Sequence, residues 1–341
     1  MSSFARLWQE IAPIGRAGSG GYLRFALTEP ELTLRDWFRA QATTRDMTVT
    51  EDGNGNLFAW RGEPWAPGTV LTGSHFDSVP HGGGYDGPLG IVSAFLAADR
   101  IPPDRKIGIA AFVEEEGGRF GVPCLGSRLL SGVMDPARAA ALTDRDGISF
   151  GEALGKTPMG RIDHLKNLKA VVELHIEQGV ALQTPVGVAS AIWPHGRWRM
   201  DFTGVGDHAG TTRMADRRDP MLTFAFTVLA ANKEARLSGA HATVGRVHVE
   251  PNATNAIPSL VRGWLDARAA DTATLDKLVD EVVRKATERA GRDGTTVAVT
   301  PESVTPEVAF DGPLATHLSK VLGDAPILPT GAGHDAGVLS A

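Results

Sequence analysis

A histidine and two aspartates follow an apolar run near residue 70 with the spacing of a metal site. Residues 69–72 read as a short buried strand, and His75, Asp77 and, after a glycine-rich loop, Asp86 come next. A neutral imidazole can bind a metal ion while a carboxylate two residues later accepts its other N–H. We therefore predict that His75 and Asp86 are metal ligands and that Asp77 orients His75. The competing interpretation is a glycine-rich surface loop that carries an ordinary histidine.

Two later strands end in further groups of the same kind. Residues 107–113 form an apolar run that leads into three consecutive glutamates, 114–116, and residues 170–174 form another that leads into His175. Three carboxylates this close repel one another unless a cation or a proton separates them. Ligands of open α/β sheets bind at the carboxyl ends of the strands. Three strands that deliver His, Asp and Glu to one edge therefore favour a metal site over a surface loop.

The composition limits what else the chain could be. It has 341 residues, of which 42% are apolar, enough for two domains with full cores. The single cysteine, Cys124, excludes an intramolecular disulfide and a cysteine-rich zinc site, and we expect it to be a small buried packing residue. With a net charge of −6, the chain lacks the excess of basic residues that is typical of proteins that bind nucleic acid or an anionic membrane. With no signal-peptide pattern and no long apolar run, the expected location is cytoplasmic.

Periodicity predicts an α/β fold with two domains. Strand and helix patterns alternate up to about residue 191, as in a three-layer α/β/α sandwich. From residue 192 the texture changes, because residues 197–204 and 260–268 alternate polar with apolar side chains, which is typical of antiparallel strands with one wet face. We predict a catalytic domain of residues 1–191 and 304–341, with an inserted α+β domain of residues 192–303.

Six motifs carry a resemblance to a known family. In chain order they are Gly-Ser-His-x-Asp-Ser-Val-Pro with Gly-Gly-x-x-Asp-Gly, Glu-Glu-Gly-x-Arg-Phe, His-Ile-Glu-Gln-Gly, Asp-His-Ala-Gly-Thr-Thr, Pro-Asn-x-x-Asn-x-Ile-Pro and Gly-Ala-Gly-His-Asp-Ala. The sequence resembles the M20-type metallo-amidohydrolases of the N-carbamoyl-L-amino acid hydrolase, allantoate amidohydrolase and β-ureidopropionase group. The resemblance covers nearly the whole chain.

The resemblance implies a binuclear hydrolase of ureido compounds that releases ammonia and carbon dioxide. Two divalent ions, zinc or manganese, would be bound, one by His75, Asp86 and His175 and the other by Asp86 and Glu116. Glu115 would be the general base, while Glu114 has no implied role. A ureido carbon is a poor electrophile, so its hydrolysis needs both metal polarisation and a base.

The resemblance also gives the inserted domain the roles of a lid and a dimer interface, so a homodimer is expected. His208 would stabilise the developing oxyanion. The implied substrate contacts are Gln178, Asn255, Arg268 and His334, with Arg268 gripping a substrate carboxylate. Allantoate and an N-carbamoyl amino acid both present a carboxylate and a ureido group, so the motifs do not choose between them.

Three features depart from the family pattern. Arg213 stands where relatives have proline, and the connection from Gln183 to Val186 is short. Relatives also have a later Gly-x-Ser-His segment whose histidine completes the second metal site, so we expect the natural chain to run on past Ala341. Two alternative functions remain: an aminoacylase or dipeptidase of the same superfamily, and a non-catalytic binding module of this fold.

Overall fold

A computed structural model describes residues 2–340 of the chain. Its contacts divide the chain into two compact units, one formed by Thr184–Ala332 and the other by the residues on either side of that segment. Each unit has its own sheet and its own buried core. None of the helices in the described part of the chain has the length and hydropathy needed to cross a bilayer.

The first unit is built on a five-stranded mixed sheet with the order β1-β2-β4-β3-β5. Strands β1 and β2 form an antiparallel hairpin, and β3 lies parallel to both β4 and β5. The bounds are β1 (Thr48–Glu51), β2 (Leu57–Arg61), β3 (Val70–His75), β4 (Ile107–Phe112) and β5 (Ala170–Glu173). β4 is buried along its whole length because it lies inside the sheet with both faces covered.

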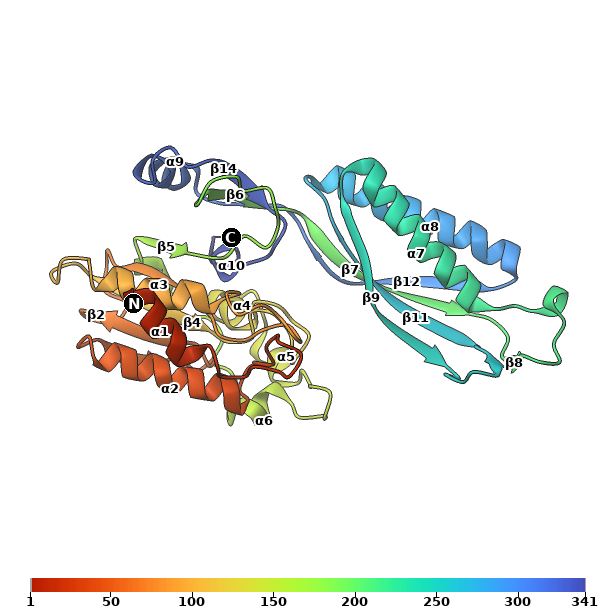
Figure 1. The fold of residues 1–341 in the computed structure, drawn as a ribbon, viewed down its shortest axis with the longest axis horizontal. Helices are drawn as coiled ribbons and strands as arrows, with labels where there is room; N and C mark the ends of the chain where they lie inside the picture. Colours follow the sequence, from red (N-terminus) through yellow and green to blue (C-terminus); the bar gives the residue numbers. More distant parts are fainter. Residues whose placement is uncertain (1, 341) are drawn as a thin grey trace. The chain divides into compact units, whose positions relative to one another are not determined.

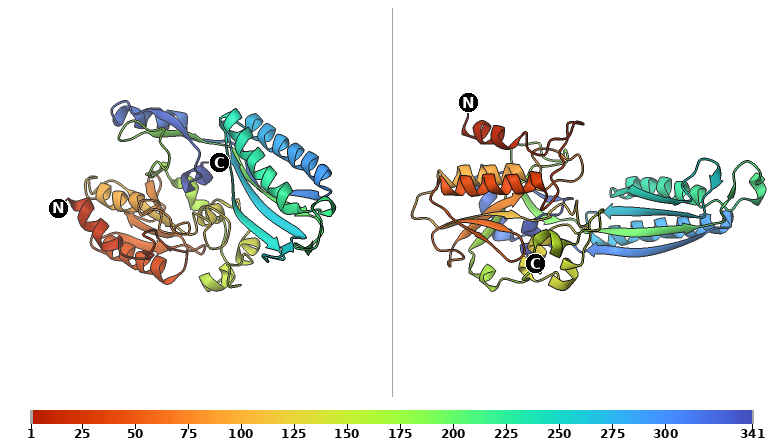
Figure 2. Two further views of the ribbon diagram at one scale, coloured as in Figure 1. Left: turned by 45° about the vertical axis from the view of Figure 1, so that its right-hand side comes forward. Right: turned by 90° about the horizontal axis from the view of Figure 1, so that it is seen from below.

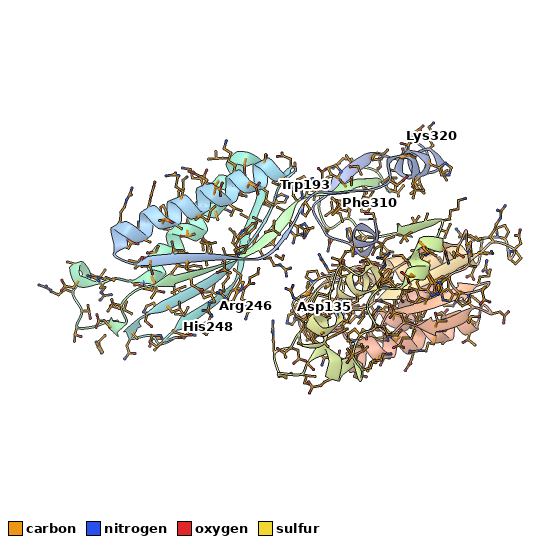
Figure 3. The ribbon with its side chains drawn as sticks, turned by 180° about the vertical axis from the view of Figure 1, so that it is seen from behind. Asp135, Trp193, Arg246, His248, Phe310 and Lys320 are labelled. Atoms are coloured by element: carbon orange, nitrogen blue, oxygen red, sulfur yellow. The ribbon has the colours of Figure 1, made fainter. Side chains whose placement is uncertain are left out.

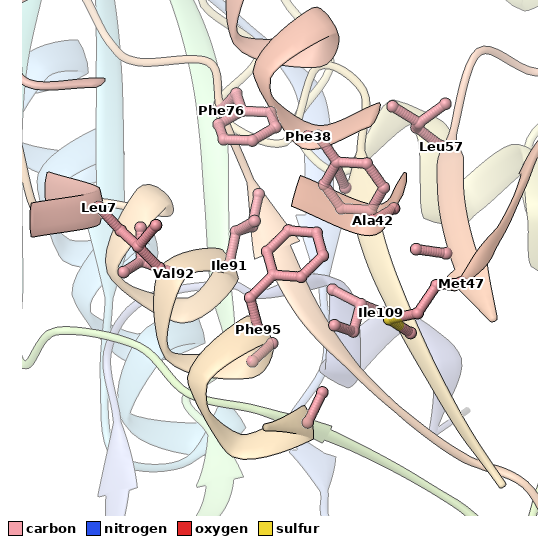
Figure 4. Packing of buried hydrophobic residues seen from close by; sticks show 14 of the residues in the cluster. Leu7, Phe38, Ala42, Met47, Leu57, Phe76, Ile91, Val92, Phe95 and Ile109 are labelled. Carbon is pink, nitrogen blue, oxygen red and sulfur yellow. The ribbon is translucent and has the colours of Figure 1, made fainter. Parts of the chain in front are cut away.

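Helices cover both faces of this sheet, which confirms the predicted α/β class. On one face lie α1 (Ser3–Ile11), α2 (Glu29–Thr43) and α3 (Pro88–Ala98), whose apolar residues form a core with β2 and β4 that centres on Phe38, Phe76 and Phe95 (Figure 4). On the other face lie α4 (Leu125–Ser131), the 3-10 turn η1 (Asp163–Asn167) and α10 (Asp335–Leu339). The short helices α5 (Pro136–Ala140) and α6 (Phe150–Leu154) pack beside α4.

The second unit contains a four-stranded antiparallel sheet with the order β12-β7-β11-β9. The strands are β7 (His195–Thr203), β9 (His241–Glu250), β11 (Leu260–Arg268) and β12 (Thr296–Thr305). Helices α7 (Pro220–Ser238) and α8 (Thr272–Asp293) cover one face of it (Figures 1 and 2). Alternate residues of β7 and β11 are buried under these helices, so the predicted one-sided burial is confirmed. The helix-free face is polar and carries Arg246 and His248 (Figure 3).

A small third sheet shifts the domain boundary away from the predicted positions. β6 (Val188–Ile192) pairs with β13 (Val308–Ala309) and with β14 (Ile327–Thr330), and α9 (Gly312–Val321) packs on them. These segments group with the second unit rather than with the first. The helix-like pattern of α9 is visible in the sequence, but strands of two to five residues carry too little alternation to show that they pair.

The core of the first unit leads to a stability prediction. The ring of Phe38 is fully buried and lies edge-on to Phe76 and Phe95 at centroid distances of 6.3 and 5.1 Å. Phe38→Ala should lower the free energy of unfolding by about 3–5 kcal/mol, because the lost apolar burial leaves a cavity. Leu32→Ala, on the same helix but 45% exposed, is the matched control and should change it by well under 1 kcal/mol. Similar urea midpoints for the two variants would contradict this packing.

Candidate functional site

The carboxyl ends of three neighbouring strands form the candidate site. β3 lies between β4 and β5 and runs parallel to both, so the residues after these strands reach the same edge of the sheet. His75 is the last residue of β3 and is paired with Phe112 of β4. The glutamates 114–116 follow β4, and His175 follows β5, whose last residue is Glu173. The strand order therefore brings together the groups that the sequence predicts there.

His75, Asp86 and His175 come close enough to hold one ion, since one ligand atom from each lies within 4.8 Å of the others. The Nε2 atoms of the two histidines are 3.4 Å apart, and His175 Nε2 is 3.2 Å from Asp86 Oδ1. Each Nδ1 faces a backbone carbonyl oxygen at 3.0 Å, that of Asp77 for His75 and that of Ile176 for His175. With Nδ1–H donated in this way, both Nε2 lone pairs point into the site, as a cation requires.

Gly87 explains why the loop that returns Asp86 is rich in glycine. Its φ is +83°, in the left-handed region that side chains rarely adopt. A Cβ there would lie 2.5 Å from the carbonyl oxygen of His75 and 2.6 Å from its ring. Only glycine lets the loop pass this close behind the imidazole.

Asp77 acts differently from the prediction. Its carboxylate is 3.6 Å from His75 Nδ1, farther than its own backbone carbonyl oxygen. Instead, the two carboxylate oxygens accept the backbone N–H groups of Glu115 and Glu116 at 3.2 and 3.0 Å. Asp77 therefore joins the end of β3 to the segment after β4, a contact between distant parts of the chain that spacing alone does not reveal.

The three consecutive glutamates have three different surroundings. Glu114 Oε1 accepts the backbone N–H groups of Arg119 and Phe120 at 3.0 and 2.5 Å and so closes the turn after β4. Glu115 is buried, and its Oε2 is 3.5 Å from His75 Nε2. Glu116 Oε1 is buried with no hydrogen-bond partner among residues 2–340. An orphaned carboxylate oxygen beside the histidine pair is a natural position for a metal ligand.

Burial and crowding perturb the acids of the site in opposite directions. Burial raises the pKa of Glu116 to about 7, with the Asp86 carboxylate adding to the effect and His75 opposing it. Burial also acts to raise the pKa of Asp86, but contact with His175 and the charge of His75 outweigh it and bring the value to about 2. Burial raises the pKa of Glu115 well above its usual value, and it raises that of Glu114 to about 8. The facing carboxylates of Asp86 and Glu116, whose pKa values differ this much, can share a proton in the position that a cation would take.

Two predicted substrate contacts lie beside the histidines in the same unit. The side-chain amide of Gln178 donates to Asp86 Oδ2 at 2.7 Å, so here it orients a ligand carboxylate. The ring of His334 lies 4.3 Å from that of His175, centroid to centroid, and its Nδ1 is buried without a partner among the described residues. Burial, followed by the nearby charge of His175, lowers the pKa of His334 to about 4, so the ring is neutral at pH 7.

Two further acids lie in this region, the half-buried Glu173 and the fully buried Asp335. Glu173 accepts the Ser74 hydroxyl at 2.9 Å and the backbone N–H of Ala336 at 2.9 Å, which ties β3 to α10. Asp335 accepts the hydroxyl of Ser127 at 2.5 Å. The signal for Glu173 was available, because it is an acid at the end of a strand two residues before His175. Asp335 lies in the Gly-Ala-Gly-His-Asp-Ala motif, but no local pattern reveals its partner, which is 208 residues away.

The second unit carries the remaining predicted residues at two separate places. His208 lies on β8 (Asp207–His208), which pairs with β10 (Ala256–Ile257), and the carbonyl of Asn255 accepts the Ala209 N–H at 2.9 Å. The side chain of Arg268 lies at the other end of β11. Its Nε and Nη2 donate to the carboxylate of Asp266 at 2.9 and 3.2 Å, and its Nη1 donates to the carbonyl oxygen of Gly331 at 2.8 Å.

A known protein family matches most of this chain, including the candidate site. The sequence profile of peptidase family M20/M25/M40 matches residues 71–341, which include the whole histidine and carboxylate cluster. The chain belongs to this family. An N-carbamoyl-L-amino acid amidohydrolase of Geobacillus stearothermophilus is 34% identical over 97% of this chain and 86% of that protein. The allantoate amidohydrolase of Escherichia coli is 32% identical over 78% of this chain and 68% of that protein.

A solved structure agrees in both fold and sequence. The crystal structure of an amidase of the hydantoinase/carbamoylase family from Burkholderia vietnamiensis is 31% identical to this M20 chain, with a TM-score of 0.87. The match covers 99% of this chain and 86% of that one. The M20 family is metal-dependent, and the His75, Asp86 and His175 group fits that requirement.

Metal binding should release protons, because a cation binds the deprotonated forms of its ligands. Glu116 has a pKa of about 7 in the metal-free protein, and nearby acids hold the pKa of His75 above its usual value despite the opposing effect of burial. At pH 7 we expect release of about one to two protons on metal binding and a fall in affinity as the pH drops to 6. Calorimetric titration with zinc in two buffers of different ionisation enthalpy measures this number.

Two histidine variants complete this experiment: one removes a residue of the site, and the other is its matched control. His175→Ala should abolish tight binding, whereas His164→Ala, at an exposed position outside the site, should leave both affinity and proton release unchanged. A proton count near zero at pH 7 would show that the site is already deprotonated before metal binds.

Proposed function

We propose that this protein is a metal-dependent amidohydrolase that cleaves the ureido C–N bond of allantoate or an N-carbamoyl-L-amino acid. Water is consumed, and the released carbamoyl group yields ammonia and carbon dioxide. The observation that carries the proposal is the buried Glu115 placed 3.5 Å from a histidine of the His75, Asp86 and His175 group. The similarity to carbamoyl and allantoate amidohydrolases over most of the chain supports the choice of a ureido bond.

We propose that the site holds two zinc or manganese ions. His75, Asp86 and His175 would hold the first ion, and Asp86 would bridge to a second held by Glu116. The orphaned oxygen of Glu116 and its closeness to Asp86 support this assignment. Bound ions would polarise the ureido oxygen and lower the pKa of the attacking water. The ligands are histidine and carboxylate, a donor set that suits zinc and manganese alike.

Glu115 is proposed as the general base. Its carboxylate lies beside the histidine pair but belongs to neither ligand group, so it is available to take a proton from water and pass it to the departing nitrogen. Burial favours its neutral form, so a proton taken from water is held firmly enough to be delivered to a poor leaving group. Asp77 and the turn closed by Glu114 fix the backbone on both sides of it.

Substrate recognition is proposed to involve residues of two copies of the chain. Arg268 lies at one end of β11, while His208 and Asn255 lie beyond the other end (Figure 1). β11 has nine residues, so its ends are roughly 26 Å apart. A ureido acid is far shorter than this, and one molecule cannot touch both ends of the same sheet. A homodimer in which His208 and Asn255 act on the partner's substrate resolves this separation.

The first test is a panel of ureido and N-acyl substrates with detection of released ammonia. The metal-loaded protein should release ammonia from allantoate or from an N-carbamoyl-L-amino acid. Glu115→Gln should keep the metal while lowering kcat by about two to four orders of magnitude, the usual range for a lost general base. Glu177→Gln, at an exposed position, should keep full activity. Cleavage of N-acetyl amino acids and of no ureido compound would instead favour an aminoacylase.

A second test concerns the grip of Arg268 on the substrate carboxylate. In the structure its fork is held by Asp266, which keeps the guanidinium extended and oriented. Arg268→Lys should raise KM for the anionic substrate by about tenfold or more, because an ammonium cannot reproduce the two parallel N–H bonds. The same variant should lose little with a carboxamide analogue. An equal loss on both substrates, measured by steady-state kinetics, would assign Arg268 to the fold rather than to the substrate.

A further inference from the structure

Cys124 contacts the proposed base twice. Its backbone N–H donates to the carbonyl oxygen of Glu115 at 2.7 Å, and its Sγ lies 3.5 Å from Glu115 Oε1, within hydrogen-bond distance for sulfur. Both residues are buried. No other hydrogen-bond donor to this oxygen is found in residues 2–340, whereas Oε2 of the same carboxylate faces His75. The two oxygens of Glu115 therefore have distinct surroundings.

The backbone at Cys124 is held in an unusual conformation for this contact. Its φ is +53°, in the left-handed region that is unfavourable for any residue with a Cβ. The next two amides, of Leu125 and Gly126, donate to the carbonyl oxygens of Glu114 and Val113 at 3.1 and 3.0 Å. Three successive N–H groups at the start of α4 thus bind three successive carbonyls after β4, which fixes the position of Cys124 relative to Glu115.

A buried polar pair supports Cys124 from behind. The hydroxyl of Ser127 is 3.2 Å from the carbonyl oxygen of Cys124 and 2.5 Å from Asp335 Oδ1, and its one proton is donated to only one of these two acceptors at a time. Ser127 and Asp335 are fully buried. The Gly-Ala-Gly-His-Asp-Ala motif is in this way joined to the base through Ser127 and Cys124, although the motif lies more than 200 residues farther along the chain. This contact is independent of those between Cys124 and Glu115.

We infer that Cys124 is a positioning residue for the general base, whose thiol donates a hydrogen bond to Glu115 Oε1 and leaves Oε2 directed at the reacting water. The inference rests on the proposed function of Glu115. Burial, and then the charges of Glu115 and Asp335, raise the pKa of the Cys124 thiol, so it stays protonated and can only be a donor here. A thiol is a weak donor, so it orients the carboxylate without removing much of its affinity for a proton.

The contact can be measured without any substrate. The chain has a single cysteine, so the S–H stretching band in the infrared spectrum belongs to Cys124 alone. In the metal-loaded protein we expect this band at lower frequency than that of a free thiol. It should move upward in Glu115→Gln, because a neutral amide is a weaker acceptor than a carboxylate, and should stay unchanged in the control Glu177→Gln. A band at the free-thiol position, or one that Glu115→Gln does not move, overturns the inference.

Kinetics separates positioning from simple packing. Cys124→Ala should lower kcat about tenfold with KM and metal content unchanged, since a hydrogen bond to a charged group is lost. Cys124→Ser keeps a donor and should retain kcat within about threefold. Ser131→Ala is the matched control, because it removes a hydroxyl on the same helix whose only partner among residues 2–340 is the carbonyl oxygen of Arg128. Wild-type kcat in Cys124→Ala, or equal losses in the alanine and serine variants, overturns the inference.

The two measurements also distinguish this inference from the proposed function. If the unmodified protein cleaves no ureido compound while the S–H band responds to Glu115→Gln, the proposed function fails and the contact stands. If the protein is active and the band does not respond, the contact fails and the function stands.

Discussion

The structure depends most on the burial of several acidic groups beside two histidines, at the carboxyl ends of three parallel strands. Asp86, Glu115 and Glu116 meet there in a space that lacks enough hydrogen-bond donors for all their oxygens. Burying unpaired carboxylates is costly, so they must be neutralised by protons or by a cation. Without a cation, protonation of Glu116, whose pKa burial raises to about 7, would neutralise part of this charge. The site is therefore most stable when it holds what it is built to bind.

Hydrogen bonds of neighbouring acids hold the chain segments around the site in place. Asp77 and Glu114 each accept two backbone N–H groups, and these hydrogen bonds fix the turns that carry the proposed ligands. Glu173 and Asp335 use hydroxyl and backbone donors in the same way. Such contacts define where Glu115 and Glu116 can lie, because a carboxylate bound by two amides fixes both chain segments. The precise geometry of the site thus depends on acids outside the proposed ligand set.

Local sequence patterns were enough to predict most helices and strands. The features that they did not predict depend on contacts between residues far apart in the chain. A strong periodicity or turn signal within about ten residues marks β4, which precedes the three glutamates, β5, which precedes His175, and the β1–β2 hairpin. The gathering of strand ends followed from parallel topology, so the ligand group could be predicted as well. By contrast, the carboxylate of Asp77 binds amides almost 40 residues away, and the sheet of β6, β13 and β14 joins segments over 100 residues apart. No local period encodes such partners.

In the second unit, strand β11 separates two proposed substrate-binding residues, Arg268 and His208. The arginine at the end of β11 is locked by Asp266 and by the carbonyl oxygen of Gly331, which gives a rigid cationic group beside the segment that leads back to the first unit. His208 lies at the far end, on the exposed strand β8, where its Nδ1 accepts the backbone N–H of Gly210 at 3.1 Å. An exposed imidazole with a satisfied Nδ1 has its Nε2 free to act on a group supplied from outside its own sheet. In the proposed homodimer, the rigid arginine would suit recognition within one chain, and the imidazole would suit the substrate of the partner chain.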